Sequence, residues 1–182
     1  FEVRAMAYSN SKSPNFNFIL NQSDYKSYNW QNNFRNQQTK QLAIALKSKK
    51  YGSLQLDYNT IGNYLYFAKN EGASVKPFQH DGTLNYIRVK FSNEISYKKF
   101  ALNNTILFQN VFDGDEVLNV PQLVTRHSFY YTNEFFKKAL FLQTGITLSY
   151  FSSYSMNAYD PLLGEFYTQN TRELGNFPRA DF

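Results

Sequence analysis

Charged and amide side chains alternate with apolar ones in several stretches of the sequence, and this pattern could line a water-filled channel. In the segment 87–91, Arg88 and Lys90 are flanked by Ile87, Val89 and Phe91. In a β-strand, such an alternation places the two cations on one face and the apolar residues on the other. The same parity argument applied to segments 53–58 and 142–149 gives six candidate lining residues in all: Gln55, Asp57, Arg88, Lys90, Gln143 and Thr147.

The expected chemistry of such a lining is charge selection. Cationic side chains in a pore favour anions, so we expect Arg88 and Lys90 to bias passage toward anionic solutes. Interior salt bridges are the alternative role for the same two residues.

The sequence contains no recognisable catalytic or metal-binding motif. The absence of cysteine excludes disulfides, zinc–thiolate sites and cysteine nucleophiles. His80 and His127 have no histidine or carboxylate close to them in sequence, so a structural or surface role is favoured. The acidic run Asp113, Asp115 and Glu116 lacks the ligand spacing of an EF-hand, and an ordinary acidic loop is favoured over a Ca²⁺ site. We therefore expect no enzymatic activity, no cofactor and no metal.

Composition limits the class of protein. The 182 residues include 18 Phe and 15 Tyr, yet the mean hydropathy is −0.54 and no apolar run approaches the roughly 18 residues of a transmembrane helix. A soluble β-protein and a membrane β-barrel both remain, because alternating strands hide an apolar face from averaged hydropathy. The net charge of +5 comes from basic residues that are spread along the chain. A role of these residues in solubility and in the turns explains this charge better than nucleic-acid binding does.

Two-residue periodicity predicts the elements that would position the candidate residues. Lys-Lys pairs at 49–50, 98–99 and 137–138 predict short turns between long strands, and polar stretches at 9–30, 68–82 and 152–175 predict long loops at the other end. Gly62 interrupts one strand and predicts a β-bulge. The expected strands lie at about 1–8, 33–47, 51–67, 83–97, 100–112, 122–136, 139–151 and 176–182.

The length of these strands favours a membrane barrel. Strands of globular proteins usually run 3–10 residues, whereas about 9–11 residues cross a bilayer. A large soluble sandwich or curved sheet explains the alternation equally well, but not the strand length. Aromatic residues also gather at the predicted strand ends, where an aromatic girdle would lie: Tyr51, Tyr97, Phe100, Phe136, Tyr150 and Phe151. The prediction is an all-β, transmembrane, antiparallel up-and-down β-barrel with about eight strands.

Several spaced motifs resemble the β-barrel porin family of Bacteroidetes outer membranes. The resemblance covers most of residues 30–182 in order, and residues 1–29 only loosely. It is carried by Ser128-Phe129-Tyr130-Tyr131, residues 135–145, Ala158-Tyr159-Asp160-Pro161, Gly164-Glu165-Phe166-Tyr167, residues 174–179 and, earlier, residues 61–67.

The resemblance implies an outer-membrane barrel, in the role of a diffusion channel. Family members are longer, so the chain resembles one domain, residues 1–182, incomplete at both ends. The strand-like opening Phe1–Ala5, without an initiator Met or a signal peptide, agrees with this expectation. Strand number matters because eight strands leave an interior filled by side chains, whereas 16–18 leave an aqueous channel.

Competing functions stay open at this point. The leading one is a porin that lets small solutes and ions diffuse across the bacterial outer membrane, with outer-membrane lipids and other outer-membrane proteins as further partners. The alternative is a non-conducting outer-membrane barrel with a structural, secretion-machinery or surface-binding role. An enzyme would need a catalytic constellation, and a soluble carbohydrate-binding domain would need more exposed tryptophan than Trp30.

Overall fold

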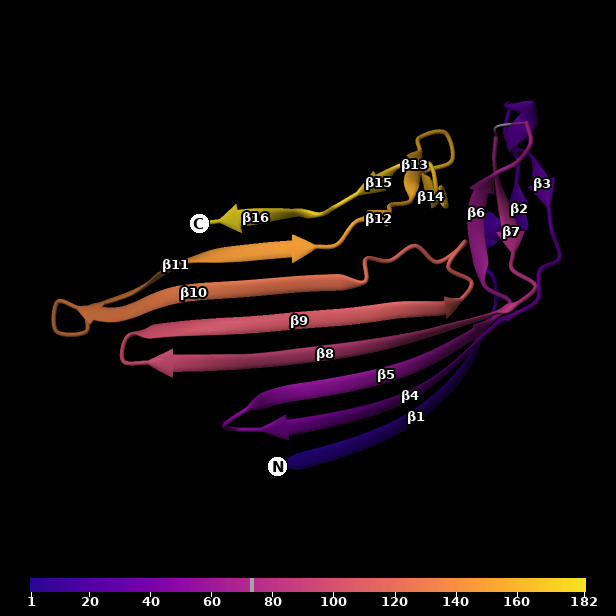
Figure 1. The fold of residues 1–182 in the computed structure, drawn as a ribbon. Coiled ribbons are helices and arrows are strands. Elements are labelled where there is room, and N and C mark those ends of the chain that lie inside the picture. Colours follow the sequence, from indigo (N-terminus) through magenta and orange to yellow (C-terminus); the bar gives the residue numbers. More distant parts are fainter. Residues whose placement is uncertain (73) are drawn as a thin grey trace.

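A single large antiparallel sheet organises the molecule (Figure 1). The computed structural model describes residues 1–72 and 74–182. Neighbouring strands of the sheet are all antiparallel, in the order β1-β4-β5-β8-β9-β10-β11-β16. Their bounds are Glu2–Lys12 (β1), Gln37–Ser48 (β4), Gly52–Gly62 (β5), Thr83–Tyr97 (β8), Phe100–Asp113 (β9), Leu123–Phe135 (β10), Leu140–Phe151 (β11) and Phe177–Asp181 (β16). The all-β, antiparallel up-and-down fold class is confirmed.

The sheet is open, with β1 and β16 as its two edges. Within the described residues these edge strands do not pair with each other, and the arrangement is that of part of a barrel wall. The helical elements are short, namely α1 (Phe16–Ile19) and the 3₁₀ turn η1 (Lys26–Tyr28). No helix in the described part of the chain is long and apolar enough to cross a membrane.

Short turns join the long strands at one end of the sheet, at the left in Figure 1. Lys98 and Lys99 alone link β8 to β9, as the Lys-Lys pattern predicts, and Lys98 takes a φ of 56°. The β10–β11 turn takes four residues, 136–139, and three of them have positive φ although none is Gly. Non-glycine residues rarely adopt this conformation. The Lys-Lys pair 137–138 therefore predicts the place of this turn, although the turn has none of the glycines that usually supply such a conformation.

The predicted strand 51–67 is confirmed from Gly52 to Gly62 and is wrong in placing residues 63–67 in the same strand. β5 ends at Gly62, and Asn63 takes a left-handed φ of 56°, so the chain leaves the sheet where a bulge was expected. The residues that follow form a separate hairpin: β6 (Leu65–Lys69) begins in the predicted strand, and β7 (Val75–Gln79) lies inside the predicted loop 68–82. Asparagine tolerates the left-handed conformation better than most residues, and this explains how the strand stops here.

The long connections pack against one another at the other end of the sheet. The predicted loop 9–30 contains α1 and β2 (Leu20–Asn21), and β2 pairs with β3 (Trp30–Gln31). Phe18 stacks on the buried Phe67 of β6 with ring centroids 4.5 Å apart, and Trp30 lies 6.4 Å from the same ring. The predicted loop 152–175 contains the short strands β12 (Tyr154–Ser155), β13 (Ala158–Asp160), β14 (Glu165–Tyr167) and β15 (Glu173–Leu174). We call this packed set of connections the cap; it comprises the predicted loops 9–30 and 152–175 and the β6–β7 hairpin.

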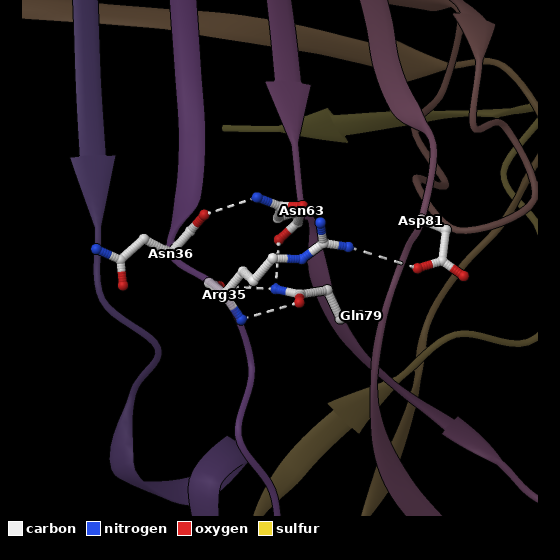
Figure 2. A network of polar contacts seen from close by, with 5 residues as sticks. All are labelled: Arg35, Asn36, Asn63, Gln79 and Asp81. Atoms are coloured by element: carbon white, nitrogen blue, oxygen red, sulfur yellow. Dashed lines mark hydrogen bonds and ion pairs between the residues drawn. The ribbon is translucent and has the colours of Figure 1, made fainter.

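Hydrogen bonds fasten the cap to the sheet at the corner that Figure 2 shows. The Gln79 side chain donates to the backbone oxygens of Arg35 (2.7 Å) and Asn63 (3.1 Å), and it accepts from the Arg35 amide (3.0 Å). Asn63 Nδ2 donates to the Asn36 oxygen at 3.0 Å, and Arg35 lies 3.9 Å from Asp81. Three chain segments that leave the sheet are thus held together by one amide side chain.

Candidate functional site: the polar face of the sheet

The two faces of the sheet differ in chemistry. Residues directly opposite on neighbouring strands share a face, so the register extends each strand's alternation across the whole sheet. On one face, large apolar side chains stay exposed to the surroundings; Leu42 is 60% exposed and Leu148 50%. The exposed residues of this apolar face include Ile44, Leu46, Leu54, Leu56, Ile106, Phe108, Phe129, Leu142 and Ile146.

The other face carries all six candidate residues. Gln55 lies opposite Lys90, and Asp57 opposite Arg88, across the β5–β8 pair. Thr147 on β11 shares this polar face through its register with Ser128 on β10. Their common face agrees with the parity argument, while their role as a pore lining stays a prediction.

Three of the six candidates form one hydrogen-bonded cluster. Asp57 Oδ2 accepts from Arg88 Nη2 at 2.8 Å and from Arg88 Nε at 3.1 Å. Gln55 Nε2 donates to both carboxylate oxygens of Asp57, at 2.9 and 3.1 Å. The Asp57 side chain is only 2% exposed, whereas that of Arg88 is 42% exposed. A buried carboxylate needs such partners because desolvation of an unpaired charge costs several kcal/mol.

This cluster separates the two cations that the sequence treated as equivalent. The charge of Arg88 is compensated by Asp57 at hydrogen-bonding distance. Lys90 is exposed, lies opposite the neutral Gln55, and makes no ion pair with any residue that the structure describes. The salt-bridge alternative therefore holds for Arg88, and Lys90 is the one of these two cations whose charge is not paired among the described residues.

Gln143 and Thr147 lie apart from that cluster. They belong to β11, which β9 and β10 separate from β8. The Thr147 hydroxyl lies 2.9 Å from the Ser128 hydroxyl, and the Gln143 side chain is exposed. Both contribute neutral polar groups to the face, and neither is brought near Asp57, Arg88 or Lys90.

Sequence reasoning missed several residues of the polar face. Arg4 of β1 and Lys47 of β4 lie on it, because they stand opposite Ala45 and Ser53, which share the parity of Gln55. Arg126 of β10 lies there too, opposite Ser149. The alternation around Leu46 could have revealed Lys47, whereas the mixed pattern in 122–136 concealed Arg126.

At the cap end, the polar face is covered by protein. Ile61 and Leu84 share the parity of Asp57 and Arg88, and both are buried together with Val117 of the β9–β10 connection. Gly114 permits this approach: it has a φ of +84°, and a Cβ there would lie 1.7 Å from Leu84 Cδ2. The connection 114–122 therefore folds over the polar face.

The histidines and the acidic run have structural contacts. His80 Nδ1 lies 3.6 Å from Glu116, so it links the β7–β8 corner to the connection 114–122. His127 Nδ1 lies 2.7 Å from Asn104 Oδ1, and Asn104 Nδ2 donates to Asn93 at 3.0 Å. These three residues form a polar chain on the apolar face, across β8, β9 and β10. Among the described residues no group of three or more His, Asp or Glu side chains is placed to hold a metal.

An antiparallel sheet of long strands with one exposed apolar face and one polar face is the architecture of part of a β-barrel protein. The sequence matches, over residues 1–182, the model of the protein family described as "Putative porin". The chain therefore belongs to this porin family, and the match includes residues 1–29, where the resemblance in the sequence is loose. No curated protein and no solved structure matched the chain.

Proposed function

We propose that the chain forms part of the wall of an outer-membrane barrel through which small solutes and ions diffuse passively. One observation carries the proposal: apolar side chains are exposed on one face of the long strands, while the opposite face is polar. Five strands, β4 and β8 to β11, have 12–15 residues, longer than the roughly 9–11 that cross a bilayer. The apolar face would contact lipid acyl chains, and the polar face would contact the water of the lumen. Family membership supports the porin class.

The polar face supports a preference for anions, which Lys90 would provide in larger measure than Arg88. A cation without a nearby carboxylate attracts anions and repels cations in a narrow aqueous space. Arg88 contributes less because the Asp57 carboxylate lies 2.8 Å away. The porin is not expected to carry out chemistry on its solutes.

A second candidate is a barrel that does not conduct but acts through its cap, as a structural, secretion-machinery or surface-binding partner. The cap supports it, since Phe18 and Trp30 pack around the buried Phe67 and the connection 114–122 covers the polar face. A cap that filled the lumen would stop diffusion.

Single-channel recording of the full-length protein in a planar bilayer separates these functions. The protein is first shown to be a folded barrel by a change in its gel mobility in detergent when the sample is boiled. Stable unitary current steps, with a reversal potential that favours anions in a salt gradient, are the expected result. A folded barrel that gives no steps would contradict the channel and favour the second candidate.

A further inference from the structure

The polar face contains a small basic cavity near the short turns. Its volume is about 210 Å³, and it is lined by residues of β1, β4, β5 and β8. Since one water occupies about 30 Å³ of liquid, the cavity has the volume of about seven waters. This space suits a small solute ion with part of its hydration shell.

The side chains that line the cavity carry a net positive charge. Its lining includes three cations, Arg4, Lys47 and Lys90, and one acid, Glu2. The Glu2 carboxylate accepts from Arg4 Nε, so that pair accounts for one charge of each sign. Lys47 stands opposite Glu2 across the β1–β4 pair but forms no ion pair with it, and neither Lys47 nor Lys90 has an ion-pair partner in the described parts of the chain. The net charge is +2, from three cations less one carboxylate.

Neutral donors lie between the two lysines. Ser53 and Ser92 both line the cavity and stand directly opposite each other on β5 and β8. Lys47 stands opposite Ser53 on the other side of β5. Ammonium and hydroxyl groups are donors that oxyanions accept, and charged hydrogen bonds are roughly twice as strong as neutral ones.

The Asp57–Arg88 cluster contains a carboxylate partner of the kind that Lys90 lacks. Asp57 and Arg88 are the next pair on this face toward the cap, and there a carboxylate of the protein itself accepts from the cation. At Lys90 the corresponding position is Gln55, whose amide nitrogen is already engaged with Asp57. Two like charges around one cavity repel each other unless an anion lies between them.

We propose that Lys47 and Lys90, together with the Ser53 and Ser92 hydroxyls, bind a doubly charged oxyanion of the phosphate class. The two uncompensated ammonium groups match a dianion, whereas chloride would leave one of them without a partner. Inorganic phosphate and the phosphate group of a phosphorylated solute share this chemistry. A role of this site in transport rests on the proposed channel function, whereas the binding of phosphate itself does not.

The test is calorimetric titration of the folded, full-length protein in detergent micelles with inorganic phosphate, at constant ionic strength. K47Q/K90Q is expected to weaken phosphate binding about tenfold or more, because two charged hydrogen-bond donors are lost. K40Q is the matched control. Lys40 lies on the same strand as Lys47 but on the opposite face, so this variant should change binding less than about twofold. K47R/K90R keeps both charges and should retain binding. Titration with glucose 6-phosphate then shows whether the site accepts the phosphorylated solute as well as the free ion.

The outcomes of this test and of the channel test are independent. No phosphate binding by the folded wild-type protein, or equal binding by wild type and K47Q/K90Q, overturns the site. A loss in K47Q/K90Q that K47R/K90R does not share supports it, with gel mobility before boiling verifying that each variant is folded. Phosphate binding without unitary current would contradict the channel alone, and current without phosphate binding would contradict the site alone.

Discussion

The two ends of the sheet are built in different ways. At the cap end, Phe67, Val75, Leu84 and Val117 are buried and form the apolar packing expected of a protein in water. At the turn end, aromatic side chains such as Phe136 stay exposed, and Lys47 and Lys90 form no ion pair with any residue that the structure describes. The difference indicates that the cap is stabilised by its own core, whereas the strands depend on their hydrogen-bond ladders and on what surrounds them.

The largest expected effect comes from opening the core at the cap end. Leu84 is fully buried against Ile61 and Val117, so Leu84→Ala should lower the free energy of unfolding by about 3 kcal/mol. Urea unfolding in detergent, together with hydrogen exchange of residues 114–122, measures it. Leu42→Ala removes the same atoms from the exposed apolar face and should cost less than about 1 kcal/mol. Equal losses at the two positions would contradict the comparison.

Removal of the buried carboxylate should have a smaller effect on stability but a clear one on selectivity. Asp57→Asn leaves Arg88 without its partner, and we expect a loss of about 2 kcal/mol, moderated by the exposure of Arg88. The freed guanidinium should raise the anion-to-cation permeability ratio, as measured from reversal potentials. Asp115→Asn makes the same chemical change at an exposed position. An unchanged ratio in a conducting Asp57→Asn channel would mean that this cluster does not face the permeation path.

Within the cap, Tyr28 forms one of the hydrogen bonds that join two connections distant in sequence. The Tyr28 hydroxyl donates to Asp160 Oδ2 at 2.7 Å, and this bond is the largest cause that raises the pKa of Tyr28, followed by desolvation. Because the protonated phenol is the bonded form, its contribution is fully present below about pH 10 and is lost as pH rises through the raised pKa.

Tyr28→Phe should therefore cost about 1 kcal/mol near neutral pH and flatten the alkaline loss of stability. Unfolding curves recorded between pH 8 and 11 would measure both effects. Tyr25→Phe removes a hydroxyl from a neighbouring exposed tyrosine and serves as the control. An alkaline transition that stays the same in Tyr28→Phe would show that another group causes it.

The smallest effect is expected on the apolar face, where the chain Asn93–Asn104–His127 interrupts the apolar surface. Asn93→Leu breaks one bond of the chain and should cost about 0.6 kcal/mol, a typical value for a polar contact between membrane-embedded segments. Replacing all three residues with Leu leaves no polar group unpaired and should be neutral or stabilising in a bilayer. A triple variant less stable than the single one would contradict a lipid environment for this face.

Alternation predicts much of the sheet because one face of each strand is apolar and the other is polar. The strand expected at 83–97 coincides with β8, and four others differ by only one residue at one or both ends. The cap was not predictable in this way. Its contacts, such as Phe18 with Phe67, join residues far apart in sequence, and the end of β5 depends on the left-handed conformation of Asn63.

For the candidate site, parity predicts which residues share a face but not which of them touch. The Asp57–Arg88 pair depends on the register of β5 against β8, and a connection of 20 residues, 63–82, separates these strands in sequence. Register alone distinguishes Arg88 from Lys90, since one lies opposite an aspartate and the other opposite a glutamine.

The most direct test of the central claim, that the polar face lines a water-filled passage, is thiol labelling on adjacent residues of β8. The chain contains no cysteine, so Lys90→Cys and Val89→Cys each introduce one reactive group into it on opposite faces of the same strand. Each variant of the full-length protein, in lipid vesicles, is treated with a charged methanethiosulfonate reagent that cannot enter the bilayer. The account predicts fast reaction at position 90 and little at position 89. Fast reaction at position 89 with protection at position 90 would contradict it.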